Sequence, residues 1–144
     1  MKIAIGCDQN ASELKEQLKA FIMELGHVCV DFGGDEPIYA NTAIRLAQAV
    51  AAEECDRGVL ICGTGIGMCI AANKVKGIRC ALCTSIEMAR LSREHNNANI
   101  LALGGRTTKP EDALMMVDTW IKTEFLGDRH ARRVAMLDEY GCDE

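Results

Sequence analysis

The sequence predicts an α/β protein, a three-layer αβα sandwich built on a Rossmann-like, doubly wound, five-stranded parallel sheet. Short apolar runs alternate along the chain with segments whose apolar residues recur every three or four positions, the spacing of a helix face. Almost wholly apolar runs are typical of strands that helices bury on both faces of a parallel sheet. With 144 residues, 49% of them hydrophobic, the chain has room for one core, so we expect a single domain over residues 1–144.

The first half of the chain supplies two strand and helix pairs. Lys2 to Cys7 is an apolar strand, and Ser12 is expected to cap the helix that follows. Gly26 is the stop signal of this helix, whose apolar face consists of Leu14, Leu18, Phe21, Ile22 and Leu25. Residues 28–32 give a second strand and residues 39–54 a second helix.

The second half repeats this pattern around a glycine-rich turn. The apolar run Val59 to Ile61 leads to Cys62 and then to three glycines, and a helix extends from Met68 to Ala72. The remaining elements are expected as a strand (Ile78 to Cys83), a helix (Ile86 to Arg93), a strand (Ile100 to Leu103), a helix that begins at Pro110 and passes Trp120, and a last helix from about Arg129 to Tyr140.

The charge and hydropathy of the chain exclude several classes of partner. A formal charge of −5 and a pI of about 5.2 argue against a nucleic-acid binder, whose affinity depends on clustered cations. No run of about 18 apolar residues occurs, and the first residues enter a strand directly without a signal-peptide pattern. We therefore expect a cytoplasmic protein with neither nucleic acid nor membrane as a partner.

Cysteine is unusually frequent, with eight residues. Those in apolar runs are expected to be reduced thiols that pack as small hydrophobic residues: Cys7, Cys29, Cys62, Cys69, Cys80 and Cys83. Cys80 and Cys83 form a C-x-x-C pattern, but they lie in a strand, where residues three apart point to opposite faces. We therefore expect no metal site there.

Several polar residues follow predicted strands and should meet at one edge of the sheet. In doubly wound sheets the ligand lies outside the carboxyl ends of the strands. The segments that emerge there are residues 7–9, 62–67, 84 and 104–106. We also expect His95, just before the fifth strand, at the same edge as Cys62.

The glycine-rich turn does not fit the common phosphate loops. A dinucleotide pattern requires a third glycine where Met68 or Ile70 stands, a Walker loop requires lysine and serine or threonine, and a cysteine phosphatase requires arginine at position 68. The backbone N–H groups of the turn could hold an oxyanion beside Cys62, which would act as a general base. Cys62 as a buried residue that only fills space at a strand end is an equally open alternative.

Four long motifs resemble the ribose-5-phosphate isomerase B family, which includes galactose-6-phosphate isomerases. They read G-C-D, L-I-C-G-T-G-I-G followed by I-A-A-N-K-V-K-G-I-R, L-S-R-E-H-N-N-A-N-I-L-A-L-G-G-R, and D-R-H-A-R-R-V. The resemblance covers almost the whole chain. It implies an aldose–ketose isomerase that works through a cis-enediolate without metal or organic cofactor. It also implies a homodimer with active sites built from both subunits, with pairing into tetramers left open.

The resemblance also implies roles for individual residues. Cys62 is the base that moves the proton between C2 and C1, and Thr64 assists at the sugar oxygens. His95 helps open the furanose ring, and Asp8 is its acidic partner at the sugar end. The residues implied to bind substrate are Gln9, Tyr39, Gly63, Gly65, Ile66, Gly67, Asn96 and Arg106, together with Arg129 and Arg133, which hold the phosphate. The last two are four residues apart and therefore share a helix face.

Two departures leave the substrate open. Gln9 stands where the family has histidine, and Tyr39 lies in the sequence I-Y-A-N-T-A instead of D-Y-P-x-Y-A. Ribose 5-phosphate is the expected substrate, with allose 6-phosphate, galactose 6-phosphate or a tetrose 4-phosphate as alternatives. A non-catalytic sugar-phosphate binding module and, from the cysteines, a thiol redox protein are the competing hypotheses.

Overall fold

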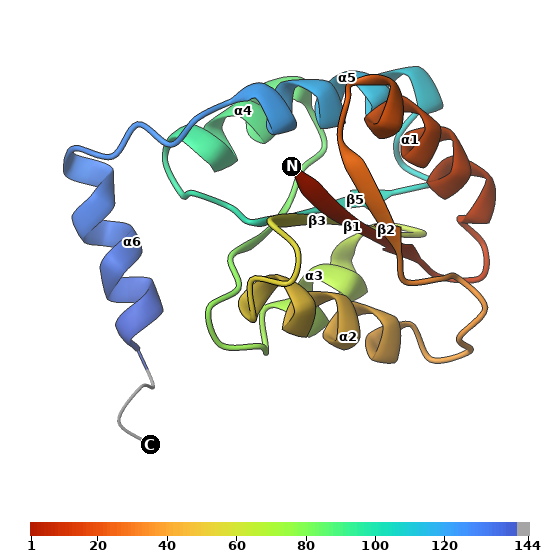
Figure 1. Cartoon of the computed structure of the whole chain (residues 1–144), viewed down its shortest axis with the longest axis horizontal. Coiled ribbons are helices and arrows are strands. Elements are labelled where there is room, and N and C mark those ends of the chain that lie inside the picture. The colour runs from red at the N-terminus through yellow and green to blue at the C-terminus, as the bar shows by residue number, and fades with distance from the viewer. Residues whose placement is uncertain (141–144) are drawn as a thin grey trace.

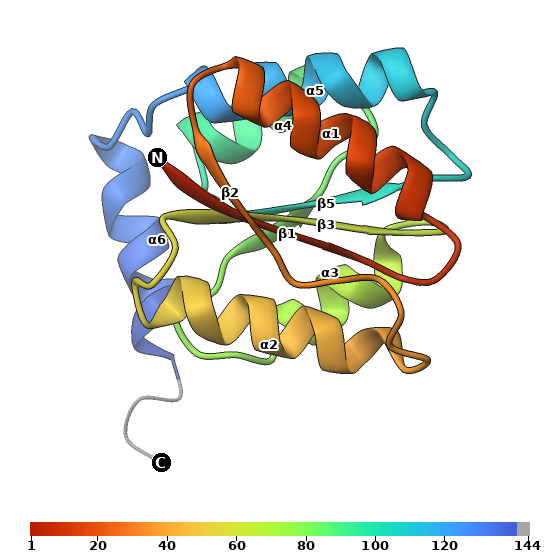
Figure 2. The same cartoon turned by 45° about the vertical axis from the view of Figure 1, so that its right-hand side comes forward.

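Five parallel strands lie between two layers of helices in the computed structural model, which describes residues 1–140 (Figures 1 and 2). The elements in chain order are β1 (Lys2–Cys7), α1 (Ser12–Glu24), β2 (Val28–Asp31), α2 (Tyr39–Ala51), β3 (Arg57–Cys62), α3 (Ile66–Ala72), β4 (Cys80–Leu82), α4 (Ile86–Glu94), β5 (Ile100–Gly104), α5 (Pro110–Lys122) and α6 (Arg129–Glu139). The predicted α/β fold is confirmed, and each expected strand and helix is present.

The sheet has the strand order β2-β1-β3-β5-β4. The chain winds outward from β1 to β2, then crosses to β3 and continues in the other direction, so the winding reverses between β1 and β3. Along the sheet Cys7 pairs with Ile61, and Cys62 pairs with Gly104. The predicted meeting of strand ends at one carboxyl edge is therefore confirmed.

The core has two halves, one on each face of the sheet. On the face covered by α1, α4 and α5, Val59 and Ile61 pack with the fully buried Trp120. On the face covered by α2 and α3, Leu60 and Cys62 pack with other apolar side chains (Figure 2). This alternation along β3 is the period of two that a strand imposes.

The C-x-x-C residues are separated by the same alternation. Cys83 belongs to the core half under α1, α4 and α5, whereas Cys80 packs against the half under α2 and α3. The prediction that they point to opposite faces is confirmed. The cysteines of residues 1–140 are all free thiols, and Cys142 lies outside the described residues.

The predicted cap of α1 is wrong. Ser12 is the first residue of the helix, the N-cap position belongs to Ala11, and no side chain caps the helix. The hydroxyl of Ser12 instead hydrogen-bonds with the thiol of Cys7. Within residues 1–140, no helix combines the length and the apolar character that crossing a membrane requires.

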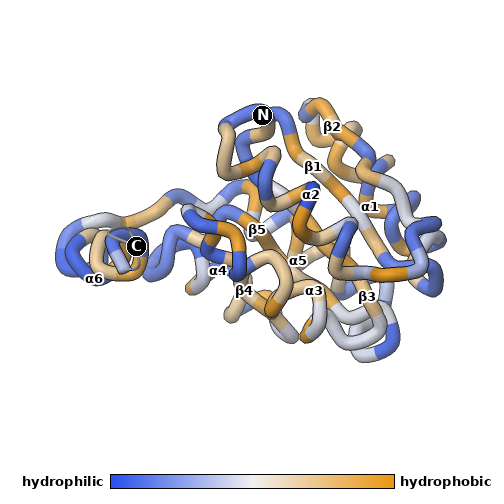
Figure 3. Tube along the Cα trace, turned by 90° about the horizontal axis from the view of Figure 1, so that it is seen from below, coloured by the Kyte–Doolittle hydropathy of each residue, from blue (hydrophilic) through white to orange (hydrophobic). Residues whose placement is uncertain are grey.

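Helix α6 stands apart from the three layers, beyond the amino ends of the strands (Figures 1 and 3). Arg79, just before β4, pairs with Asp138 of this helix at 2.9 Å. Three large side chains near its end are largely exposed: Met136 (64%), Leu137 (62%) and Tyr140 (90%). Much of the apolar surface of this helix is therefore left uncovered by its own chain.

Candidate active site

Cys62 is the last residue of β3 and is buried, with 7% of its surface exposed. The backbone N–H of Gly65 donates a hydrogen bond to its Sγ atom at 3.1 Å. Gly65 itself has φ of +80°, and a Cβ there would lie 2.5 Å from Leu82 and 2.9 Å from the backbone of Leu103. Glycine is therefore required for the turn that brings this N–H to the sulfur.

The turn leads directly into α3 and is covered by a tyrosine. Thr64 is exposed, and its Oγ1 accepts a hydrogen bond from the N–H of Ile66 at 3.3 Å. A Cβ built on Gly67 would lie 2.8 Å from the ring of Tyr39, at the start of α2. The absence of a side chain at position 67 thus lets the tyrosine ring lie directly against the first turn of α3.

Asp8 and Gln9 follow β1 at the same edge. The N–H of Asp8 donates to the carbonyl of Ile61 at 3.0 Å, which extends the β1–β3 ladder by one residue. Oδ1 of Asp8 accepts from the N–H of Asn10 at 3.1 Å, and the Gln9 amide donates to the carbonyl of Asp35 at 3.2 Å. Gln9 therefore ties its own loop to the loop after β2.

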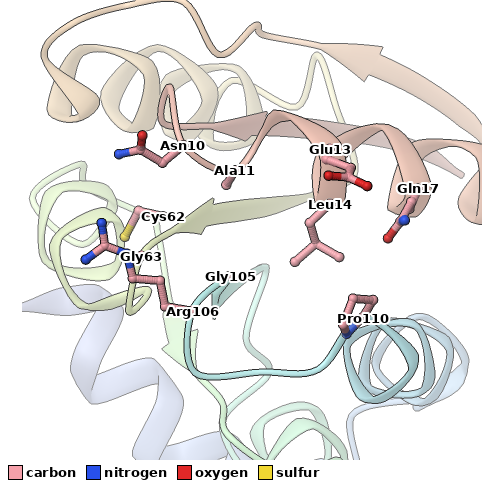
Figure 4. Close-up of a pocket in the computed structure, with 10 residues that line it drawn as sticks. All are labelled: Asn10, Ala11, Glu13, Leu14, Gln17, Cys62, Gly63, Gly105, Arg106 and Pro110. Carbon is pink, nitrogen blue, oxygen red and sulfur yellow. The ribbon is translucent and has the colours of Figure 1, made fainter.

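Arg106 reaches this edge from the end of β5. Its N–H donates to the carbonyl of Gly63 at 2.9 Å, and that of Gly105 donates to the carbonyl of Cys62 at 2.7 Å. The guanidinium lies along Gly63, with its Nε 3.7 Å from the place where a Cβ of that residue would be. Figure 4 shows this side chain beside the sulfur of Cys62.

A pocket of about 250 Å³ extends from Cys62 between the first turns of α1 and α5 (Figure 4). It is lined by Asn10, Ala11, Glu13, Leu14, Gln17, Cys62, Gly63, Gly105, Arg106 and Pro110. Glu13 and Gln17 were missed by the sequence analysis, because nothing in the pattern of an exposed helix face indicates which turn borders a pocket.

His95 does not lie at the edge that the sequence analysis expected. It is the C-cap of α4, and the carbonyl of Asn99, four residues later, accepts from the N–H of Gly58 at the start of β3. Gly58 and Cys62 are four residues apart along the strand, about 13 Å. The expectation is wrong because a residue that precedes a parallel strand lies at its amino end, opposite the carboxyl end where Cys62 stands.

The predicted phosphate residues lie at the amino edge with His95. Arg129 and Arg133 are exposed in the first turns of α6, and Asn96 directly follows His95. His130, which the sequence analysis missed, stacks on His95 with ring centroids 4.3 Å apart. Desolvation lowers the pKa of His130, and the neighbouring His95, Arg129 and Arg133 lower it further. The basic run R-H-A-R-R is the sequence feature that could have identified His130 as a site residue.

The predicted site residues thus form two groups at opposite edges of the sheet. Those at the carboxyl edge are Asp8, Gln9, Tyr39, Cys62, Gly63, Thr64, Gly65, Ile66, Gly67 and Arg106. Those at the amino edge are His95, Asn96, Arg129 and Arg133. Figure 2 shows α6 at one end of the strands, with the turn that begins α3 at the other. One chain cannot bring both groups around one small substrate.

Comparisons with known proteins give a consistent result. Residues 3–137 match the family model described as Ribose/Galactose Isomerase. The chain is 44% identical to ribose-5-phosphate isomerase B of Escherichia coli, over 94% of this chain and 93% of the relative. It is 40% identical to D-erythrulose-4-phosphate isomerase of Pectobacterium atrosepticum, over 100% of this chain and 97% of the relative. The solved ribose-5-phosphate isomerase B of Clostridium thermocellum superposes with a TM-score of 0.93 at 51% identity, covering 96% of each chain.

Proposed function

Since this chain belongs to the ribose/galactose isomerase family and is a sugar phosphate isomerase, we propose that it interconverts ribose 5-phosphate and ribulose 5-phosphate, with Cys62 as the base. The reaction moves one proton between C2 and C1 of the open-chain sugar. The observation that supports Cys62 most strongly is its position at the carboxyl edge, where the N–H of Gly65 is 3.1 Å from its sulfur.

In the proposed reaction the thiolate of Cys62 removes the proton from C2 of the aldose. The electron pair of the broken C–H bond forms the C1–C2 double bond of a cis-enediolate, and the C1 carbonyl oxygen gains the negative charge. The thiol then returns the proton to C1, and the C2 oxygen becomes the ketone as its hydroxyl proton passes to the C1 oxygen. No redox partner is needed, because one carbon is reduced as its neighbour is oxidised.

The turn after Cys62 is suited to the charge that develops on these oxygens. Backbone N–H groups of residues 63–67 lie in the loop before α3 and in its first turn, and fixed donors of this kind stabilise a developing oxyanion without reorganisation. Thr64 is exposed on the turn, where its hydroxyl can hydrogen-bond with the sugar. Tyr39, which lies on Gly67, would form the wall of this end of the site.

We further propose that two copies of the chain complete each site. His95, Asn96, Arg129 and Arg133 of one copy would face Cys62 of the other, because within one chain the two groups stand at opposite edges. The exposed apolar residues of α6, and Ile66 and Ile70 of α3 (51% and 58% exposed), would be covered by this association. In such a dimer His95 opens the sugar ring.

The phosphate would be held by cations from both copies. Arg129 and Arg133 of one copy lie one helical turn apart and suit a dianion, and Arg106 of the other copy lies beside Cys62. Because the chain carries a formal charge of −5, such local clusters are needed to attract a negatively charged substrate.

A tetrose 4-phosphate is the second candidate substrate. A relative that carries the name D-erythrulose-4-phosphate isomerase matches the chain over its whole length. Gln9 is uncharged, and its amide donates to the carbonyl of Asp35, so it would bind the phosphate of a longer sugar only weakly. Ribose 5-phosphate is favoured because its furanose ring gives His95 a role, whereas the only hydroxyl that could close such a ring in a tetrose 4-phosphate carries the phosphate.

Aldose phosphates of four, five and six carbons, assayed with the full chain for ketose formation in D₂O, test the proposal. We expect the highest kcat/KM for ribose 5-phosphate, with deuterium entering from solvent. If a tetrose or hexose phosphate gave the highest kcat/KM instead, that sugar phosphate would be assigned as the substrate. Tight binding without conversion or deuterium exchange for any of them would identify a binding module instead.

A further inference from the structure

A second group of cations surrounds a cavity at the amino edge of the sheet. The cavity has a volume of about 570 Å³ and is lined by Arg57, Arg79 and Arg93, with the amides of Asn97 and Asn99. Arg57 begins β3, which Cys62 ends. Five residues of strand, roughly 17 Å, therefore separate this cavity from the proposed base.

Two of these arginines are buried against the end of α5. Arg57 is 9% exposed, and its Nη1 donates to the carbonyls of Trp120 and Ile121, both at 3.2 Å. Arg93 is 4% exposed, and its Nε donates to the carbonyl of Thr123 at 3.1 Å. Both guanidiniums thus bind the carbonyl groups that a helix end leaves unpaired.

These carbonyls balance the buried charge only in part. Among residues 1–140 no carboxylate lies within ion-pair distance of Arg57 or Arg93, and a helix end offers only about half a negative charge. Burial lowers the pKa of Arg57. Burial, together with repulsion from Arg57 and Arg79, lowers the pKa of Arg93 to about 10, and the nearby carboxylate of Glu124 offsets this effect only in part. An anion that entered the cavity would relieve this repulsion.

Donors remain for such an anion. In the described part of the chain, Nη2 of Arg57 and Nη2 of Arg93 make no hydrogen bond, and neither does the amide nitrogen of Asn97. The carboxylates that line the cavity, Glu53 and Asp56, are exposed, and Asp56 accepts from the N–H of Lys2 at 2.7 Å. Their charge is therefore screened by water more than that of the buried arginines.

We propose that this cavity binds the phosphate group of a small metabolite, at a site separate from the one proposed for catalysis. Arginine is the residue best suited to phosphate, because its planar fork donates two parallel hydrogen bonds. The volume lies within the range of about 300–1,000 Å³ that small-molecule sites occupy. The cavity is therefore larger than a bare phosphate requires and has room for the rest of the metabolite.

Calorimetric titration of the full chain with inorganic phosphate tests this site. The double variant Arg129→Ala/Arg133→Ala provides the background, because it removes the clamp proposed for catalysis. We expect one phosphate to bind per chain in this background, and Arg57→Gln to weaken that binding at least tenfold. Glutamine can still donate to the α5 carbonyls while it removes the charge. Arg90→Gln, on the exposed side of α4, is the control and should leave the affinity unchanged.

Loss of all phosphate binding in the double variant, or equal binding with and without Arg57→Gln, would overturn the proposal. Should Arg57→Gln fail to fold, crystals of the unmodified chain soaked in tungstate give the second measurement. An anomalous peak between Arg57 and Arg93 is expected, and a tungstate peak found only near Arg129 and Arg133 would contradict the assignment.

Discussion

The N–H of Gly65 donates to the sulfur of Cys62 across 3.1 Å, so the turn that would hold the enediolate also orients the proposed base. The two roles depend on one piece of backbone. Gly65 has a left-handed φ of +80° and serves as the N-cap of α3. A change in this turn is therefore expected to affect catalysis and stability together, whereas a change of the sulfur alone should act mainly on catalysis.

Replacement of the sulfur tests the base directly. We expect Cys62→Ala to lower kcat about 10²- to 10⁴-fold, the usual effect of losing a general base. KM should change little, because the phosphate is held elsewhere. Cys29→Ala in β2 is the matched control, a half-buried thiol far from the turn. Similar kcat values for the two variants in steady-state assays would contradict the role of Cys62.

Gly65→Ala tests whether the turn requires glycine. The new Cβ would meet Leu82 and the backbone of Leu103 in addition to the strain of a positive φ. Gly26→Ala is the matched control, since Gly26 has φ of +93° and no atom within 4 Å of a built Cβ. The control should lose about 1–2 kcal/mol of unfolding free energy from strain alone.

Gly65→Ala should lose about 1–3 kcal/mol more than this control, because overpacking adds to the strain, and its kcat should fall with the displaced N–H. Urea unfolding and steady-state kinetics measure both quantities. A Gly65→Ala variant that matched Gly26→Ala in stability and kept its kcat would show that the turn tolerates a side chain.

The phosphate clamp is tested by arginines of the same helix. Arg133→Ala removes a charged hydrogen bond worth about 1.5–3 kcal/mol, so KM should rise roughly ten- to a hundredfold, with a smaller effect at high salt. Arg132→Ala is the control, because Arg132 is exposed and points about 100° around the helix from the adjacent Arg133. An equal rise of KM in both variants would show that the effect comes from the general loss of positive charge and not from a contact of Arg133 with the phosphate.

Stability should depend on pH through Asp31, at the end of β2. Its burial raises the pKa, but hydrogen bonds from the Gly33 N–H, Lys15 and Lys19 outweigh this and lower the pKa below the ordinary value of 3.8. A carboxylate whose pKa is lowered by folding stabilises the folded state at pH values above its unfolded pKa. This contribution is lost as the pH falls through the folded pKa.

Urea midpoints measured between pH 6 and pH 2 should therefore fall less steeply for Asp31→Asn than for the unchanged chain. Glu24→Gln, an exposed carboxylate on α1, should reproduce the steep fall of the unchanged chain. Parallel curves for the unchanged chain and Asp31→Asn would exclude this linkage.

The fold could be predicted from the sequence most accurately where local patterns decide the structure. The strand Lys2–Cys7 was predicted to the residue, because a buried parallel strand is apolar throughout. The turn at Gly65 was recognised because glycine permits its φ. Ser12 was misassigned because its hydroxyl had a tertiary partner, the thiol of Cys7, that no local pattern reveals.

The placement of site residues required the topology. Cys62 and Arg106 could be placed together because each lies at or just beyond the carboxyl end of a strand. His95 precedes one, which the sequence analysis read as the same edge. The cavity between Arg57 and Arg93 could not be predicted, because the two arginines are far apart in the chain and meet only through tertiary contacts, above all their hydrogen bonds to the end of α5.

In the proposed dimer, each active site combines Cys62 of one copy with Arg133 of the other. Cys62→Ala and Arg133→Ala are each expected to be nearly inactive at a low ribose 5-phosphate concentration. When the two proteins are unfolded together and refolded, half of the dimers should be mixed, and each mixed dimer has one intact site. The mixture should therefore recover about one quarter of the activity of the unchanged chain. Activity no higher than the mean of the two variants would show that the site does not combine these residues from two copies.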